Sequence, residues 1–185
     1  MKIACDIDHV TLDFRAAWTE LYFTWFDRHP VDIDAEAVDK WNFLPSTHFK
    51  DYDEFYEWFD VANGWAKLPF VTGALGGLWS LVKAGHNIEL VTARNPGAAR
   101  VAAHGLAKDL TLAFARPIQV SFLSGQNKWQ AKADVWIDDS PEVLKELKAH
   151  SKKGIRFNKP WNKTSPYFAK ADDWFEVLNI VKGLA

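Results

Sequence analysis

The chain has 185 residues, of which 48% are hydrophobic, and its formal net charge is −2. This length suits one compact domain, or a domain with a modest insertion. The charge leaves no broad basic face, which argues against nucleic acid as a partner. Cys5 is the only cysteine, so an intramolecular disulfide is excluded and a reducing compartment is favoured. With no apolar run long enough for a membrane span, we expect a cytoplasmic protein without a membrane partner.

The first predicted element is a short buried strand at residues 3–5, because an apolar run ends there in two carboxylates, Asp6 and Asp8. From Phe14 onward the apolar residues recur at helical spacing, which predicts a helix. Pro30 is expected to end this helix, because proline cannot donate the backbone hydrogen bond that a helix interior needs.

Two more helical segments rich in acidic and aromatic residues are predicted around residues 34–38 and 52–59. Residues 15–72 are therefore expected to form a small helical cap inserted after the first strand. The remaining residues, 1–14 and 73–185, are expected to form the core. We expect the cap to cover the end of the sheet where the first strand stops.

After Gly73, helices and strands alternate regularly. The expected strands are residues 88–91, 118–122, 135–137 and 155–157, and the expected helices are residues 74–84, 98–108, 141–150 and a last one that Asp172 caps and that runs towards Lys182. This alternation predicts an α/β fold with a Rossmann-like parallel sheet flanked by helices. Such sheets bind ligands beyond the carboxyl ends of their strands.

Asp6 and Asp8 are two residues apart in an extended segment, so both carboxylates face the same site. Two carboxylates this close repel each other unless a cation or a shared proton intervenes. Alone, the pair could equally be two turn residues, or Asp8 could cap the helix that begins at Phe14.

Asp138 and Asp139 follow another predicted strand. By themselves they are best explained as a helix start, with Ser140 as the cap and Pro141 in the first turn. Beside a second acidic pair on a neighbouring strand, however, they predict an acidic cluster at one edge of the sheet. Oxygen ligands without a nearby histidine or cysteine suit Mg²⁺.

Two further side chains could bind phosphate. Thr92 ends a strand, and its hydroxyl with the backbone N–H groups around Ala93 could hold a phosphoryl oxygen. Lys128 precedes Asp138 by ten residues and could neutralise both the acids and a phosphate. The alternatives are an ordinary threonine at a strand end and an ordinary solvated lysine.

In this order the residues resemble the four motifs of the haloacid dehalogenase (HAD) superfamily of phosphatases: Asp6, Asp8 and Val10, then Thr92, Lys128, and Asp138 with Asp139. The 5′(3′)-deoxyribonucleotidase branch is resembled more closely, through Leu12-Asp13-Phe14, the step from Lys128 to Asp138, and Ala171-Asp172-Asp173-Trp174. The resemblance covers both ends and the sheet core and is weak across the insertion.

This resemblance implies a Mg²⁺-dependent phosphomonoesterase that hydrolyses (deoxy)nucleoside 5′-monophosphates through an aspartyl-phosphate. Asp6 would be the nucleophile and Asp8 the general acid and base. Mg²⁺ would lie on Asp6, the main-chain oxygen of Asp8, and Asp138, with Asp139 in support. Thr92, Ala93 and Lys128 would bind phosphate, and the substrate contacts would be Phe14, Trp41 and Arg94. We also expect His9 to contact the substrate, although a histidine is not usual at this position in the family.

One position departs from the family pattern, because His9 stands where glycine is usual, and a glycine tolerates a positive φ. Two alternative functions stay open at this point. The chain could be a HAD phosphatase for another small phosphomonoester, or a non-catalytic nucleotide-binding protein that retains the fold. A homodimer is also left open.

Overall fold

The computed structural model describes residues 1–26, 42–94, 97–164 and 168–184. The chain forms two compact units: unit 1 contains Met1–Leu12 and Phe70–Ala185, and unit 2 contains Asp13–Pro69. Each of the two boundaries lies a few residues before the one expected from the sequence. None of the helices in the described part of the chain has the length and apolar character that a membrane crossing needs.

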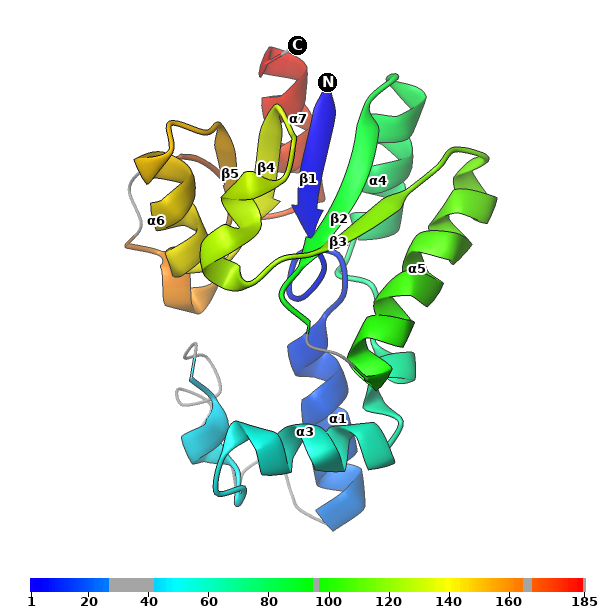
Figure 1. The fold of residues 1–185 in the computed structure, drawn as a ribbon, viewed down its shortest axis with the longest axis vertical. Coiled ribbons are helices and arrows are strands. Elements are labelled where there is room, and N and C mark those ends of the chain that lie inside the picture. Colours follow the sequence, from blue (N-terminus) through cyan, green and yellow to red (C-terminus); the bar gives the residue numbers. More distant parts are fainter. Residues whose placement is uncertain (27–41, 95–96, 165–167, 185) are drawn as a thin grey trace. The chain divides into compact units, whose positions relative to one another are not determined.

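Unit 1 is built on a six-stranded sheet with the strand order β3-β2-β1-β4-β5-β6 (Figure 1). All five strand pairs are parallel. The strands are β1 (Lys2–Asp6), β2 (Asn87–Thr92), β3 (Gln119–Phe122), β4 (Val135–Asp138), β5 (Gly154–Phe157) and β6 (Ala169–Ala171). The predicted Rossmann-like α/β fold is confirmed. Because β1 lies between β2 and β4, the strand order reverses beside it, and open sheets bind ligands at such a point.

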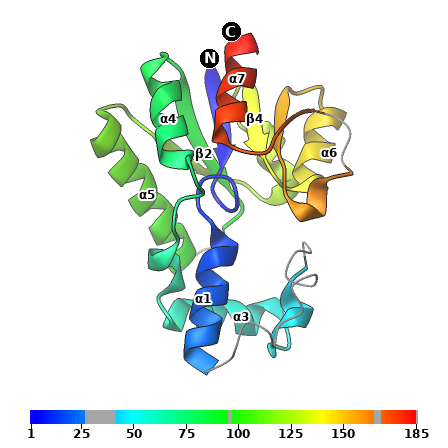
Figure 2. The same cartoon turned by 180° about the vertical axis from the view of Figure 1, so that it is seen from behind.

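Helices cover both faces of this sheet. They are α4 (Ala74–Lys83), α5 (Ala98–Phe114), α6 (Pro141–Ala149) and α7 (Trp174–Leu184). Helices α4 and α7 lie side by side on one face (Figure 2), and Gly77 of α4 leaves room for the ring of Trp174. On the other face, α6 packs Leu144 and Leu147 in a cluster with Trp136 of β4.

Three details of unit 1 differ from the sequence prediction. Strand β6 was not predicted, because Ala169-Lys170-Ala171 contains no β-branched or aromatic residue and only Ala171 is buried. Helix α5 continues past residue 108, because Leu110 and Phe114 extend its buried stripe. The side chain that caps α7 is Asp173, which accepts a bond from the Glu176 N–H at 2.8 Å, whereas Asp172 bonds Asn158.

Unit 2 contains α1 (Phe14–Phe26), α3 (Tyr52–Val61) and the short 3-10 helices η2 (Leu44–Ser46) and η3 (Gly64–Lys67). Its core consists mostly of aromatic rings, among them Phe14, Trp18, Phe43, Phe55 and Phe59. Asp13 accepts a hydrogen bond from the Ala16 N–H at 3.0 Å and so caps α1, which removes the alternative that Asp8 does so. The predictions at Pro30 and at residues 34–38 lie outside the described residues.

Candidate active site

The carboxyl end of β1 places Asp6 at the centre of the sheet edge. The Ile7 N–H donates to Asp6 Oδ1 at 2.7 Å, and the Thr11 hydroxyl donates to the Asp6 main-chain oxygen, also at 2.7 Å. The loop then closes on itself, since the N–H groups of Thr11 and Leu12 both donate to the Ile7 oxygen. Hydrogen bonds therefore fix both the side chain and the main-chain oxygen of Asp6. Thr11, which is fully buried, was missed by the sequence analysis because nothing near it in the sequence marks it.

Lys128 joins the two acidic pairs that the sequence placed on separate strands. It lies on η4 (Gly125–Gln130), and its Nζ is 2.8 Å from Asp6 Oδ1 and 3.2 Å from Asp138 Oδ2. Asp6, Asp138 and Asp139 each offer an oxygen, and these oxygens lie within 4.8 Å of one another. All four side chains are buried. The structure thus brings together three of the four acids that the sequence predicted to form a cluster, whereas the side chain of Asp8 pairs with Arg94.

Burial controls the charge of this cluster. Desolvation raises the pKa of Asp6 to about 7 although Lys128 opposes the shift, and desolvation also raises the pKa of Asp139. Burial alone would lower the pKa of Lys128, but the carboxylates around it more than offset this, and its pKa is raised. Three buried acids share one lysine, so they repel one another when all are ionised, and a divalent cation would offset this repulsion. The donors of this site are the carboxylate oxygens that Mg²⁺ prefers.

Asp8 makes a two-point ion pair with Arg94. Arg94 Nε donates to Asp8 Oδ2 at 3.1 Å, and Nη2 donates to Oδ1 at 2.7 Å. Burial by itself would raise the pKa of Asp8, but the guanidinium outweighs it and the pKa is lowered. Asp8 is therefore ionised and tied to the loop after β2.

Thr92 ends β2 next to β1 and is fully buried. Its hydroxyl accepts a hydrogen bond from the Arg94 N–H at 3.2 Å, and its main-chain oxygen accepts one from the Leu123 N–H at 3.0 Å. The next residue, Ala93, is exposed. The two predicted phosphate-binding residues of this loop thus lie at the same sheet edge as Asp6.

His9 has a φ of 64°, in the left-handed region that glycine occupies most readily. Its ring meets that of Trp161 edge-on, with the centroids 4.9 Å apart. Trp161 Nε1 in turn donates to Asp139 Oδ2 at 3.0 Å, and the Asn162 side chain donates to the Asp139 main-chain oxygen at 2.7 Å. Trp161 and Asn162 position Asp139. The sequence carried no signal for either residue.

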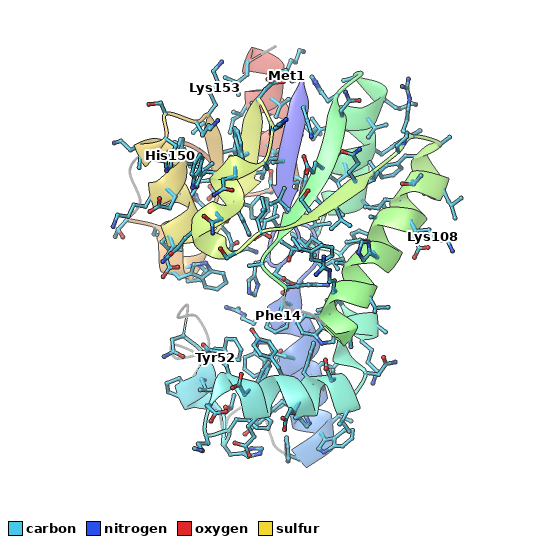
Figure 3. All side chains as sticks on the ribbon, viewed as in Figure 1. Met1, Phe14, Tyr52, Lys108, His150 and Lys153 are labelled. Atoms are coloured by element: carbon cyan, nitrogen blue, oxygen red, sulfur yellow. The ribbon has the colours of Figure 1, made fainter. Side chains whose placement is uncertain are left out.

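Two aromatic residues, Phe14 and Trp41, were predicted to contact substrate, and the structure assigns Phe14 to unit 2 and not to the core, where the sequence placed it. Phe14 lies at the start of α1 (Figure 3); it is 5% exposed and stacks on Trp65 with centroids 5.6 Å apart. Trp41 lies outside the described residues. Substrate contact by these two residues stays a prediction.

Comparison with known proteins identifies the family to which this chain belongs. The family model described as 5′ nucleotidase, deoxy (pyrimidine), cytosolic type C protein matches residues 1–184. The chain belongs to this family. Membership in the cytosolic type C nucleotidase family makes the chain a phosphatase, that is, a phosphoric monoester hydrolase, and confirms the family resemblance seen in the sequence.

Solved structures support the fold of this family member. The chain is similar to a haloacid dehalogenase-like hydrolase from Streptococcus pneumoniae, with a TM-score of 0.67 and 13% identity over 97% of both chains. It is also similar to a HAD-superfamily hydrolase from Geobacter sulfurreducens, with a TM-score of 0.61 and 12% identity over 97% of this chain and 95% of that one. For a hydrolase from Pseudomonas syringae the TM-score is 0.60, with 15% identity over the whole of both chains. No curated protein matches the chain.

Proposed function

We propose that the chain hydrolyses (deoxy)nucleoside 5′-monophosphates through an aspartyl-phosphate on Asp6 and that it needs Mg²⁺. The observation that carries this proposal is the contact of Lys128 with both Asp6 and Asp138 inside one buried cluster. A carboxylate, a cation and two more acids at one sheet edge suit attack on a phosphate ester.

In the first half of the reaction, an Asp6 oxygen bonds to phosphorus while the bond to the ester oxygen breaks. Asp8, which is ionised in the free protein, first takes up a proton from solvent. The electron pair of the broken bond goes to the leaving oxygen, which takes this proton from Asp8 and departs as an alcohol. Thr92 and Lys128 bind the oxygens of the phosphoryl group. Lys128 offsets a repulsion between carboxylate and phosphate of about 4 kcal/mol per charge pair at 4 Å and an effective dielectric near 20.

In the second half, Asp8 accepts a proton from a water molecule as that water attacks phosphorus. The bond between phosphorus and Asp6 breaks, inorganic phosphate leaves, and Asp6 regains its carboxylate. Asp6, Asp138 and the main-chain oxygen of Asp8 would hold Mg²⁺, with Asp139 in support. When bound, the ion would supply positive charge for the phosphoryl oxygens.

The nucleotide part of the proposal rests on the family and on the aromatic composition of unit 2. Nucleobases stack on aromatic rings, and each such contact is worth about 1–3 kcal/mol. Phe14 and Trp41 are the proposed contacts to the base, and His9 is proposed to contact the substrate. The family description also leads us to propose a cytoplasmic location.

The test is a panel of phosphomonoesters assayed with Mg²⁺ and with excess chelator. It should contain deoxynucleoside and nucleoside 5′-monophosphates, sugar phosphates and p-nitrophenyl phosphate. We expect the highest kcat/KM for nucleoside monophosphates and no turnover in chelator. Preference for a sugar phosphate would contradict the proposal that the substrate is a nucleotide. Binding of nucleotides without turnover of any ester would contradict the proposal that the protein is an enzyme.

A further inference from the structure

The ion pair between Asp8 and Arg94 conflicts with the part that Asp8 plays in the proposed reaction. Both carboxylate oxygens of Asp8 accept hydrogen bonds from one guanidinium, at 3.1 and 2.7 Å. To give a proton to the leaving oxygen, and then to take one from water, Asp8 needs an oxygen that the guanidinium does not hold. In the observed arrangement, both oxygens of Asp8 are bonded to Arg94.

Arg94 lies in the loop that is proposed to bind the phosphate. Its own N–H donates to the Thr92 hydroxyl at 3.2 Å, so Arg94 belongs to the same loop that is proposed to hold the phosphoryl oxygens. A guanidinium fork matches the oxygens of a phosphate as well as those of a carboxylate. A phosphate monoester dianion also carries more negative charge than one carboxylate, so it can compete with Asp8 for the guanidinium of Arg94.

We infer that Arg94 is a substrate-operated latch, which holds Asp8 in the free protein and transfers to the phosphoryl group when substrate binds, releasing Asp8 for proton transfer. This inference rests on the proposed function and adds regulation of the same site. The exposure of the two side chains agrees with it. The Arg94 side chain is 2% exposed, whereas that of Asp8 is 26% exposed, so Asp8 already borders the solvent from which a substrate arrives.

The latch has a consequence for specificity. An alcohol or a free nucleoside cannot displace Asp8 from Arg94, because it has no anionic oxygens that the guanidinium could bind. Asp8 would thus be released only in the presence of a phosphoryl group. The same ion pair also has a simpler explanation, in which Arg94 stays on Asp8 throughout turnover and only orients it.

Kinetics of Arg94→Met separate these two explanations, because methionine keeps most of the length but donates no hydrogen bond. The two substrates are p-nitrophenyl phosphate, whose leaving group needs little protonation, and a nucleoside 5′-monophosphate, whose leaving group needs an acid. The latch predicts that KM rises about tenfold or more for both substrates, while the ratio of their kcat values stays within about threefold of wild type. Arg100→Met, an exposed arginine on α5, is the matched control and should leave both parameters unchanged.

If Arg94 only orients Asp8, KM stays the same and kcat falls for the nucleotide far more than for p-nitrophenyl phosphate, which would overturn the latch. A crystal structure of the wild-type protein with Mg²⁺ and inorganic phosphate gives a second answer that does not depend on a folded variant. Arg94 on the phosphate supports the latch, and an intact pair beside bound phosphate overturns the latch alone. Failure of the wild type both to bind phosphate and to hydrolyse either ester would overturn the proposed function and the latch together.

Discussion

At Asp6, three influences act on one carboxyl group. Desolvation and the neighbouring acids Asp138 and Asp8 favour its protonated form, while Lys128 favours the carboxylate. The balance raises its pKa from 3.8 to about 7. Between these two values the folded protein binds a proton that the unfolded chain has lost. Stability of the metal-free protein therefore falls as pH rises through this window.

Asp6→Asn should abolish turnover and make the metal-free protein more stable at pH 8. Each pKa unit corresponds to about 1.4 kcal/mol, so the gain at pH 8 is on the order of a few kcal/mol, and it should shrink as the pH falls towards 4. Activity assays and urea unfolding in chelator at several pH values check both parts. Asp109→Asn, on the exposed side of α5, is the control. Retention of more than about a few per cent of activity would contradict a covalent mechanism on Asp6.

His9 is the second informative residue, because its backbone adopts a conformation with a φ of 64° that a glycine adopts at lower cost. His9→Ala and His9→Gly both remove the contact with Trp161, so they differ only in the backbone. We expect the glycine variant to be more stable than the alanine variant by about 1 kcal/mol. Urea midpoints at equal m-values measure the difference. Equal midpoints would show that the left-handed conformation costs nothing here.

At the scale of the element, α4 and α7 meet at a position that allows no side chain. A Cβ on Gly77 would lie 2.3 Å from Cε3 of Trp174, which is only 2% exposed and has no room to move. Gly76, the preceding residue of the same helix, has nothing within 4 Å of such an atom. The two adjacent glycines therefore form a matched pair.

Gly77→Ala should destabilise the protein by about 1–3 kcal/mol, because overpacking outweighs the better helix propensity of alanine. Gly76→Ala should instead be neutral or stabilising by up to about 1 kcal/mol, since only the propensity changes. Thermal unfolding of the two variants beside wild type gives the comparison. Two shifts of the same sign would contradict this account of the contact between α4 and α7.

At the scale of the whole molecule, every proposed metal ligand belongs to unit 1, on β1, β4 and the loop between β1 and unit 2. Because these ligands come together only in the folded chain, Mg²⁺ should stabilise the folded state and raise the melting temperature of the wild-type protein. At a Mg²⁺ concentration of a hundred times Kd, the gain in the free energy of unfolding is about 2.7 kcal/mol. Asp138→Asn should lose most of this shift, and Asp109→Asn should keep it.

Ca²⁺ should also bind but inhibit, since it takes more ligands in looser geometry than Mg²⁺ and would engage both oxygens of Asp6. Assays with each ion in turn check this expectation, with the melting shift as a measure of binding. Full activity with Ca²⁺, or in excess chelator, would contradict the role proposed for Asp138.

The sequence alone determined the α/β class, nine of the helices and strands described in unit 1, and the set of charged residues at the strand ends. These are local properties, because apolar periodicity and the residues at the ends of a strand can be read within a short window. Family membership followed from the same motifs, in the order in which they occur along the chain.

Only the tertiary structure decided which of these residues touch. Asp8 pairs with a residue 86 positions away, and Trp161 bonds Asp139 across 22 positions. The three-residue strand β6 forms only because β5 offers it an edge. The ring of Phe14 lies in an aromatic core whose other members are spread over unit 2. Buried polar groups need hydrogen-bond or ion-pair partners, because water does not reach them, and these partners come from distant parts of the chain. A short stretch of sequence therefore cannot show which partner each group finds.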